Sequence, residues 1–475
     1  MRNARRLSVP IRLDRDRREP LQDQLADQLR RAIDTGQLAV ETRIPSTRTM
    51  AGVLRISRGV VLSAYEVLYA EGYIVSRPGS GTYVAPGRMR ERGSAQRAHE
   101  DTSGLIDMTP GRPGVEGFPL AAWRAAWRRA THREPPNEDT PALGLPELRA
   151  AIAAHLRDSR GLVLDGHEVI VTSGYGQALR LVMRASGRRT PVIGLEDPAP
   201  PGLRRVVRGL GAVLPIPVDL AGARVDLIPR ACDTLVVMPE RNDPLGVRMS
   251  LGRREALAAW AAERGALVIE PAFDGVFNAG LGPSPSIMAV GDPALTVLVG
   301  GFCDVLTPTL RLAYAVVPRR LAKGIEADIE QPSYPCQVAV TDLLTSGCVA
   351  RRTDRLSAVY ARKRALVRRA LGGTVLLGSE TGATATVLLP GYGAAELVAH
   401  LRERQVRVAD LADYYHERRT PGSGIVLGYA HLDEVTLRRA LAVVTRSIAD
   451  GTGWNAPTVK GGTMWENTEA VPGCV

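Results

Sequence analysis

The stretch LVGGFCDVLTPTLRL, residues 298–312, passes from an apolar run into a polar loop that contains proline and arginine. The run that leads into it is short and rich in β-branched residues, which is typical of a buried strand. Helix-length stretches separate it from comparable runs at 169–172, 192–195, 235–238 and 267–270. Unalternating apolar strands separated by helices indicate a mostly parallel sheet that is buried on both faces. Ligands bind beyond the carboxyl ends of such strands, where Asp304 stands here.

The overall composition is that of a globular protein with more than one domain. The chain has 475 residues, of which 45% are hydrophobic and 23% charged, and this length predicts two or more domains. Apolar runs such as 295–301 are far shorter than the roughly 18 residues that indicate a membrane span. The basic first residues lead into no apolar signal segment. We therefore expect no membrane partner.

Cysteine and histidine usage points away from metal and disulfide chemistry. The five cysteines include no CxxC pair, and the seven histidines include no HExxH motif. Such a pattern predicts no zinc site and no disulfide framework, and it favours a reducing compartment. We expect a cytoplasmic protein without a metal site.

Positive charge is concentrated at the N-terminal end. The net charge is +11, and residues 1–90 hold 16 arginines against 9 acidic residues, a surplus of seven. This asymmetry favours a nucleic-acid-binding segment. The alternative is a solvated surface in a chain biased toward arginine, because only three of the 61 basic residues are lysines.

Residues 20–84 predict three helices followed by a hairpin. Leucine or isoleucine recurs every four residues from Leu21 to Ile33, which marks one face of a first helix. Ser46 is placed to cap a second helix, and Ser57 a third over 58–71. Strands are expected at 73–75 and 82–84, joined by a glycine-rich turn. This is the plan of a winged helix-turn-helix.

In that plan the third helix lies in the major groove of DNA. Arg58, at its start, can bind guanine O6 and N7 with both arms of its guanidinium. Serine hydroxyls and helix-start N–H groups can bind phosphates. A helical hairpin used for protein contacts is the alternative. The residues expected at the DNA are Ser46, Arg48, Ser57, Arg58, Gly59, Val60, Arg77, Gly79 and Ser80.

The same segment resembles the GntR-type DNA-binding domain. The landmarks are IPSTR at 44–48, Ser57-Arg58, YEVL at 65–68, EGY at 71–73 and RPGSGTYV at 77–84. One departure is Gly59-Val60, where many relatives carry threonine or asparagine. It leaves the base contacts open, and Gly59 should weaken the helix.

The remainder resembles aminotransferase fold type I as it occurs in MocR-type regulators of the GntR family. The landmarks are FPL at 118–120 with Trp123, GLPELR at 144–149, TSGYGQAL at 172–179, EDP at 196–198, PLGV at 244–247 and GYA at 428–430. The resemblance implies an α/β fold: an N-terminal winged helix, a large domain with a mostly parallel sheet, and a small C-terminal subdomain. The boundaries expected are 1–85 for the winged helix, 86–104 for a linker, 105–451 for the aminotransferase-like domain and 452–475 for a disordered tail.

The family cofactor is pyridoxal phosphate, and the resemblance assigns each of its contacts to a position here. The Schiff-base lysine aligns with Asp304, and the carboxylate that faces the pyridine nitrogen aligns with Pro271. The tyrosine near O3′ aligns with Phe273. Phosphate donors remain at Ser173, Gly174, Tyr175 and Arg311. Glu270 and Asp274 could approach the ring nitrogen but stand at other positions. A carboxylate cannot condense with an aldehyde, so no covalent pyridoxal phosphate and no catalytic residue is expected.

The three lysines, Lys323, Lys363 and Lys460, lie outside this motif, and the first two are expected at the surface. The sequence thus predicts a homodimeric, DNA-binding transcriptional regulator whose aminotransferase-like domain senses an unidentified small molecule or only dimerises. One alternative is a regulator that still binds pyridoxal phosphate without a covalent bond. Another is an active aminotransferase with a DNA-binding arm, which would need the missing lysine.

Overall fold

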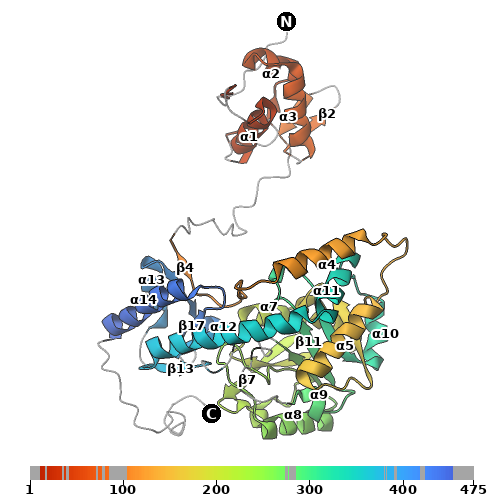
Figure 1. Ribbon diagram of the computed structural model, residues 1–475, viewed down its shortest axis with the longest axis vertical. Coiled ribbons are helices and arrows are strands. Elements are labelled where there is room, and N and C mark those ends of the chain that lie inside the picture. Colours follow the sequence, from red (N-terminus) through yellow and green to blue (C-terminus); the bar gives the residue numbers. More distant parts are fainter. Residues whose placement is uncertain are drawn as a thin grey trace. The chain divides into compact units, whose positions relative to one another are not determined.

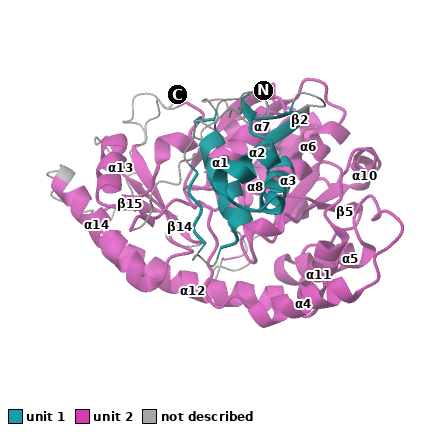
Figure 2. Cartoon of the chain, turned by 90° about the horizontal axis from the view of Figure 1, so that it is seen from above, with its two compact units in different colours: residues 1–102 teal, residues 103–475 magenta. Residues whose placement is uncertain are grey.

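The computed structural model forms two compact units, Met1–Thr102 and Ser103–Val475 (Figure 2). It describes residues 11–15, 19–34, 37–38, 42–70, 73–77, 81–84, 104–272, 277, 285–378, 380, 382–389, 393–417 and 423–452. The expected linker and tail therefore fall almost wholly outside the described residues.

The first unit has three helices and a small antiparallel sheet (Figure 1). Its helices are α1 (Leu21–Asp34), α2 (Thr47–Leu54) and α3 (Arg58–Ala70), and its strands are β1 (Arg43–Ile44), β2 (Ile74–Arg77) and β3 (Gly81–Val84). The order in the sheet is β1-β3-β2. Buried side chains of all three helices, among them Leu25, Met50 and Val61, form one core. The predicted winged helix-turn-helix is confirmed.

Strand β1 was not foreseen from the sequence. Arg43 and Ile44 pair with Tyr83 and Thr82, which adds a third strand to the two-stranded wing. A strand of two residues is too short to show an alternating pattern in the sequence. It forms because β3 has a free edge with which it can pair. The added strand holds the segment before α2 against the wing.

The second unit is built on an eight-stranded sheet in the order β5-β12-β11-β10-β9-β6-β7-β8. The strands are β5 (His167–Thr172), β6 (Val192–Asp197), β7 (Ala212–Asp219), β8 (Gly222–Ala223), β9 (Thr234–Val236), β10 (Leu267–Pro271), β11 (Thr296–Gly301) and β12 (Ala313–Pro318). The five strands from β11 to β7 pair in parallel, whereas β12 runs antiparallel to both β11 and β5. The mostly parallel sheet of the prediction is confirmed.

Helices cover both faces of this sheet, as the apolar strands require. One face packs on α6 (Tyr175–Ala185), α7 (Pro201–Arg208) and α10 (Arg319–Glu326). The other packs on α5 (Pro146–Arg160), α11 (Tyr334–Thr345) and α8 (Leu251–Arg264), with the short α9 (Ile287–Val290) beside α8. The helix α4 (Leu120–His132) packs on α11.

A smaller sheet of order β13-β14-β17-β16 forms the C-terminal subdomain. Its strands are β13 (Val375–Leu377), β14 (Thr384–Leu388), β16 (Ala409–Asp410) and β17 (Gly424–Gly428), accompanied by α13 (Ala394–Glu403) and α14 (Glu434–Thr452). The long helix α12 (Cys348–Leu371) runs from the α4 and α11 side of the unit to this subdomain (Figure 1). Strand β4 (Ile106–Asp107), from the start of the unit, pairs in parallel with β15 (Val406–Arg407).

One glycine of the opening stretch, Gly300, is required by its contact with the neighbouring strand. Gly300 of β11 is paired with Tyr314 of β12, and a Cβ on Gly300 would clash with the Tyr314 hydroxyl. Glycine at this position lets the buried tyrosine ring cross the end of β11. Burial also raises the pKa of Tyr314 to about 12. The strand end and the polar loop after it are therefore fixed by a contact between neighbouring strands.

Candidate functional site

The starts of α2 and α3 form the candidate nucleic-acid interface. Ser46 precedes α2 and accepts a hydrogen bond from the Thr49 backbone N–H at 3.2 Å. Ser57 precedes α3 and accepts one from the Val60 N–H at 3.3 Å. Each serine thus satisfies one of the N–H groups that a helix start leaves unpaired, as the sequence predicted.

Exposed arginines stand beside both capped helix starts. Arg48 and Arg58 are exposed, and Arg58 Nε lies 3.4 Å from the Thr47 hydroxyl at the start of α2. Arg55 between the helices adopts a left-handed conformation with φ 53°, which makes the sharp turn. Its carbonyl accepts a hydrogen bond from the Arg15 guanidinium at 2.9 Å. The turn therefore places two positive side chains where a phosphate backbone could approach.

The other residues expected at the DNA are only partly described. Gly59 is exposed and Val60 half-buried at the start of α3. Arg77 ends strand β2, and its side chain is not described. Gly79 and Ser80 lie outside the described residues. The sequence reasoning missed the hydroxyl of Thr47, whose only signal was its place directly after a capping serine.

Strand register brings the expected cofactor positions to one edge of the large sheet. Ala313 at the start of β12 pairs both with Thr172 at the end of β5 and with Gly301 at the end of β11. Pro271 ends the neighbouring strand β10. Ser173, Asp304, Arg311 and Pro271 therefore share the carboxyl-end edge, where ligands bind in such sheets.

The first turn of α6 contributes the expected phosphate donors. Ser173 is exposed, but its backbone N–H donates to the Gln177 side chain of the same helix at 2.7 Å. Gly174 caps α6 with φ 142°, a backbone conformation that favours glycine. Burial raises the pKa of the Tyr175 hydroxyl. The backbone N–H of Ser173 thus already has a partner within the chain, whereas its side chain remains exposed.

The loop between β11 and β12 carries Asp304 and Arg311. Asp304 is half-buried, whereas Arg311 is exposed with φ 51° after the short helix η3 (Pro308–Leu310). The Val305 carbonyl, next to Asp304, accepts a 2.5 Å hydrogen bond from the buried guanidinium of Arg352 on α12. The same guanidinium donates to the Gly114 carbonyl at 2.7 Å. Helix α12 thereby fixes the loop that holds Asp304.

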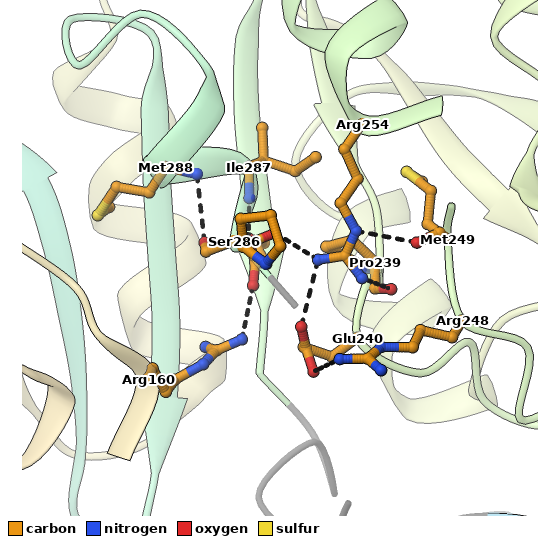
Figure 3. Close-up of polar contacts among 11 residues, drawn as sticks. Arg160, Pro239, Glu240, Arg248, Met249, Arg254, Ser286, Ile287 and Met288 are labelled. Atoms are coloured by element: carbon orange, nitrogen blue, oxygen red, sulfur yellow. Dashed lines mark hydrogen bonds and ion pairs between the residues drawn. The ribbon is translucent and has the colours of Figure 1, made fainter. Parts of the chain in front are cut away.

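Pro271 is buried and offers neither charge nor N–H, while its neighbour Glu270 is fully engaged. The Glu270 carboxylate lies 2.9 Å from Arg160 Nη2 and accepts hydrogen bonds from the Ser286 hydroxyl at 2.5 Å and the Ile287 N–H at 2.9 Å. Figure 3 shows these contacts around Arg160 and Ser286. Glu270 therefore anchors α9 and Arg160. Phe273 and Asp274 lie outside the described residues.

A second buried ion pair lies beside the first (Figure 3). Arg254 Nη1 is 3.2 Å from Glu240 and donates to the Pro285 carbonyl at 2.6 Å. Its other nitrogens donate to the carbonyls of Met249 and Pro239. Burying a guanidinium is tolerated only when its donors find acceptors, and Arg254 finds four. The two ion pairs thus hold together the interior of the large unit beside β10.

The loop after β9 is likewise packed internally. Arg241 is buried and donates to the carbonyl and hydroxyl of Thr384 in the small sheet. Asn242 donates to Glu196 at 2.8 Å and to the Pro198 carbonyl at 3.1 Å. Burial raises the pKa of Glu196 to about 7, against the opposing effect of this hydrogen bond. Arg241 therefore ties this loop to the small sheet, whereas Asn242 ties it to the end of β6.

One expectation about the lysines was wrong. Lys323 on α10 is exposed as expected, but Lys363 on α12 is completely buried. Its ammonium donates to the Ala430 carbonyl at 2.8 Å and lies 2.5 Å from Glu116. The charged surroundings in the sequence suggested a surface position, but this side of α12 lies against the small subdomain, which supplies the carbonyl partner.

The described residues offer neither a metal-binding cluster nor a membrane-spanning helix. They contain no group of three or more histidine, cysteine, aspartate or glutamate side chains that could hold a metal ion. No helix among them is both long enough and apolar enough to cross a membrane.

Comparison with known proteins gives the family. The model of bacterial regulatory proteins of the gntR family matches residues 21–84, and that of aminotransferase class I and II matches residues 105–444. This chain belongs to the HTH-type transcriptional regulators that join these two domains. GntR-type domains of this kind bind DNA.

Relatives of this GntR-type regulator match along almost its whole length. The HTH-type pyridoxine biosynthesis transcriptional regulator PdxR of Corynebacterium glutamicum is 33% identical and covers 93% of this chain and 99% of its own. The probable rhizopine catabolism regulatory protein MocR of Rhizobium meliloti is 31% identical and covers 90% of this chain and 94% of its own.

Solved aminotransferases share the fold of its large unit. The multiple substrate aminotransferase of Thermococcus profundus matches with a TM-score of 0.68 at 20% identity, over 74% of this chain and 93% of its own. The α-aminoadipate aminotransferase LysN of Thermus thermophilus, solved with N-(5'-phosphopyridoxyl)-L-leucine, matches with a TM-score of 0.65 at 25% identity, over 73% of this chain and 92% of its own.

Proposed function

We propose that this regulator binds promoter DNA as a homodimer through the starts of α2 and α3, and that its aminotransferase-like unit forms no covalent bond with pyridoxal phosphate. That unit then serves ligand sensing or dimerisation and catalyses no transamination. The observation that carries the proposal is Asp304, which occupies the loop position after β11 where the resemblance places the Schiff-base lysine.

The surrounding residues support the same conclusion, because they do not fit the cofactor. Pro271 has no charge to hold a pyridinium, and the Glu270 carboxylate is occupied by Arg160, Ser286 and the Ile287 N–H. Asp304 also places a carboxyl group at the sheet edge where an anionic phosphate would have to bind. Neither described lysine follows the carboxyl end of a parallel strand: Lys363 is engaged at Ala430 and Lys323 is on α10.

A regulator that binds pyridoxal phosphate without a covalent bond is the second candidate. The exposed Arg311 and Ser173 at the carboxyl-end edge of the sheet favour it, because both could bind a phosphate. Under this candidate Arg311→Ala abolishes any response to phosphate-bearing ligands. An Arg311→Ala protein that responds like the wild type would exclude it.

The cofactor proposal is tested on the purified full chain. The protein is titrated with pyridoxal phosphate, followed by its visible spectrum, then reduced with borohydride and weighed intact. We expect no aldimine absorption and no added mass. A reduced adduct on any lysine would overturn the proposal, and peptide mapping would identify the lysine.

The DNA proposal is tested by selecting binding sites from random duplexes with the full chain. We expect an enriched site with repeated half-sites, because the two winged helices of a dimer read repeated sequences. Arg58→Ala should weaken binding to that site by about 1–3 kcal/mol relative to nonspecific DNA. Unchanged footprinting by Arg58→Ala would exclude the assigned recognition helix, and a monomer in sedimentation experiments would exclude the dimer.

A further inference from the structure

The outward face of α3 combines a positive start with an apolar second turn. Val61, Ala64, Tyr65 and Leu68 are buried against the other helices. On the other side of the helix Arg58 and Gly59 are exposed, and the Leu62 side chain keeps 46% of its surface exposed. Residues four apart are neighbours on a helix surface, so Leu62 stands one turn beyond Arg58 on the same side.

No contact of the described fold requires a glycine at position 59. A Cβ placed on it would meet only the Ser57 hydroxyl oxygen, at an ordinary 3.8 Å, and its φ is not in the left-handed region. Glycine inside a helix costs stability relative to alanine. Because the fold does not require this glycine, its most direct physical reason is an object outside the chain that approaches the helix closely here.

Base edges in the major groove supply a matching object. They present hydrogen-bonding groups and a single apolar group, the C5 methyl of thymine. Arg58 can bind guanine, but neither Gly59 nor Leu62 can form a side-chain hydrogen bond. A backbone without a side chain, next to an exposed leucine, leaves room for a methyl group to contact the leucine.

We propose that Leu62 and Gly59 together recognise a thymine methyl adjacent to the guanine that Arg58 binds. The inference rests on the proposed DNA-binding function and specifies what that site recognises. It predicts half-sites in which a guanine and a thymine lie next to each other, with the thymine distinguished from cytosine and from uracil by its methyl group.

The test uses the selected duplex and replaces each thymine in turn by deoxyuridine, which removes only the methyl. For the wild-type full chain we expect one position per half-site, next to the essential guanine, where uracil lowers affinity about three- to fivefold, as burial of one methyl implies. Leu62→Ala should bind the thymine and uracil duplexes equally. Val67→Ala is the matched control: Val67 is also exposed on α3, at 38%, but it points away from Leu62 and should keep the uracil penalty.

Gly59→Ala provides a second test. A gain in stability combined with a loss of DNA binding would not be expected if Gly59 had only a structural role. The variant should melt at a higher temperature, because alanine favours the helix, and yet it should bind the site at least tenfold more weakly. Unchanged or tighter binding by Gly59→Ala would overturn the close approach.

The outcomes separate this inference from the function on which it rests. A chain that enriches no sequence overturns the proposed DNA recognition and this contact together. A chain that enriches a sequence but shows no uracil penalty, or keeps the penalty in Leu62→Ala, overturns the thymine contact alone.

Discussion

The Arg160 guanidinium lies 2.9 Å from the Glu270 carboxylate, and the two side chains are only 13% and 3% exposed. Arg160 ends α5 and Glu270 lies near the end of β10, so the pair joins a covering helix to the centre of the sheet. The same carboxylate also holds the first N–H group of α9. Charge pairing thus stabilises the interior at the end of β10, and the stability of this region should depend on both partners.

Arg160→Met should lower the free energy of unfolding of the large unit by about 3–5 kcal/mol, because it leaves a buried carboxylate without its countercharge. The double variant Arg160→Met with Glu270→Gln should recover much of this loss, because neither of these two positions then buries a charge. Denaturant unfolding of the full chain measures both. Arg224→Met, which breaks the exposed Arg224–Asp226 pair, is the control and should change stability by less than about 1 kcal/mol. Equal losses at the two sites would contradict the prediction.

Glu196 should make the large unit less stable as pH rises. Burial raises its pKa from 4.5 to about 7. Below pH 4.5 both folded and unfolded chains hold the proton. Between pH 4.5 and 7 the unfolded chain loses it first, so stability falls, and the loss is complete above pH 7.

Glu196→Gln should remove this dependence, because glutamine stays neutral and still accepts the Asn242 hydrogen bond. At pH 8 the variant should be more stable than the wild type by about 3 kcal/mol, at about 1.4 kcal/mol per pKa unit. Melting curves from pH 5 to 8 measure the difference. Glu263→Gln on the exposed side of α8 serves as control and should follow the wild type.

Replacing Lys363 tests the burial of this side chain. Lys363→Met keeps the aliphatic volume but removes the donor to the Ala430 carbonyl and the partner of Glu116. We expect a loss of about 1–3 kcal/mol from the unsatisfied buried carbonyl alone, and a further loss because the Glu116 oxygen that faces Lys363 is buried, although the whole side chain is 35% exposed. Lys323→Met on exposed α10 should be nearly neutral. A neutral Lys363→Met would mean that the buried position is wrong.

The serine caps of the DNA-binding unit can be tested independently of DNA. Ser57→Ala removes the acceptor of the Val60 N–H and should destabilise the unit by about 1 kcal/mol. Ser46→Ala should have a similar effect on α2. Ser63→Ala, inside α3, should not destabilise, since alanine is the best helix former. Thermal unfolding followed by circular dichroism distinguishes the three variants.

Much of the architecture was predictable because its signals are local. The capping serines at 46 and 57, the fourfold spacing from Leu21 to Ile33 and the unalternating strands each fall within a few residues of sequence. Backbone hydrogen bonding and side-chain periodicity act over the same range. The position of Asp304 at the loop after β11 follows equally from the chain alone.

The partners of polar side chains could not be predicted in this way. Lys363 lies in a run of charged residues, yet its carbonyl partner is 67 positions away, and Glu270 meets an arginine 110 positions away. No local pattern encodes contacts across such separations, because the packing of the whole unit decides which segments meet.

By itself the sequence determined the three helices and the hairpin of the first unit, its two capped helix starts, and the apolar strands of the large sheet. Only the tertiary structure decided that Lys363 is buried, that Glu270 is occupied by Arg160, and that Gly300 makes room for Tyr314. The physical reason is that element formation depends on neighbours along the chain, whereas burial and charge pairing depend on neighbours in space.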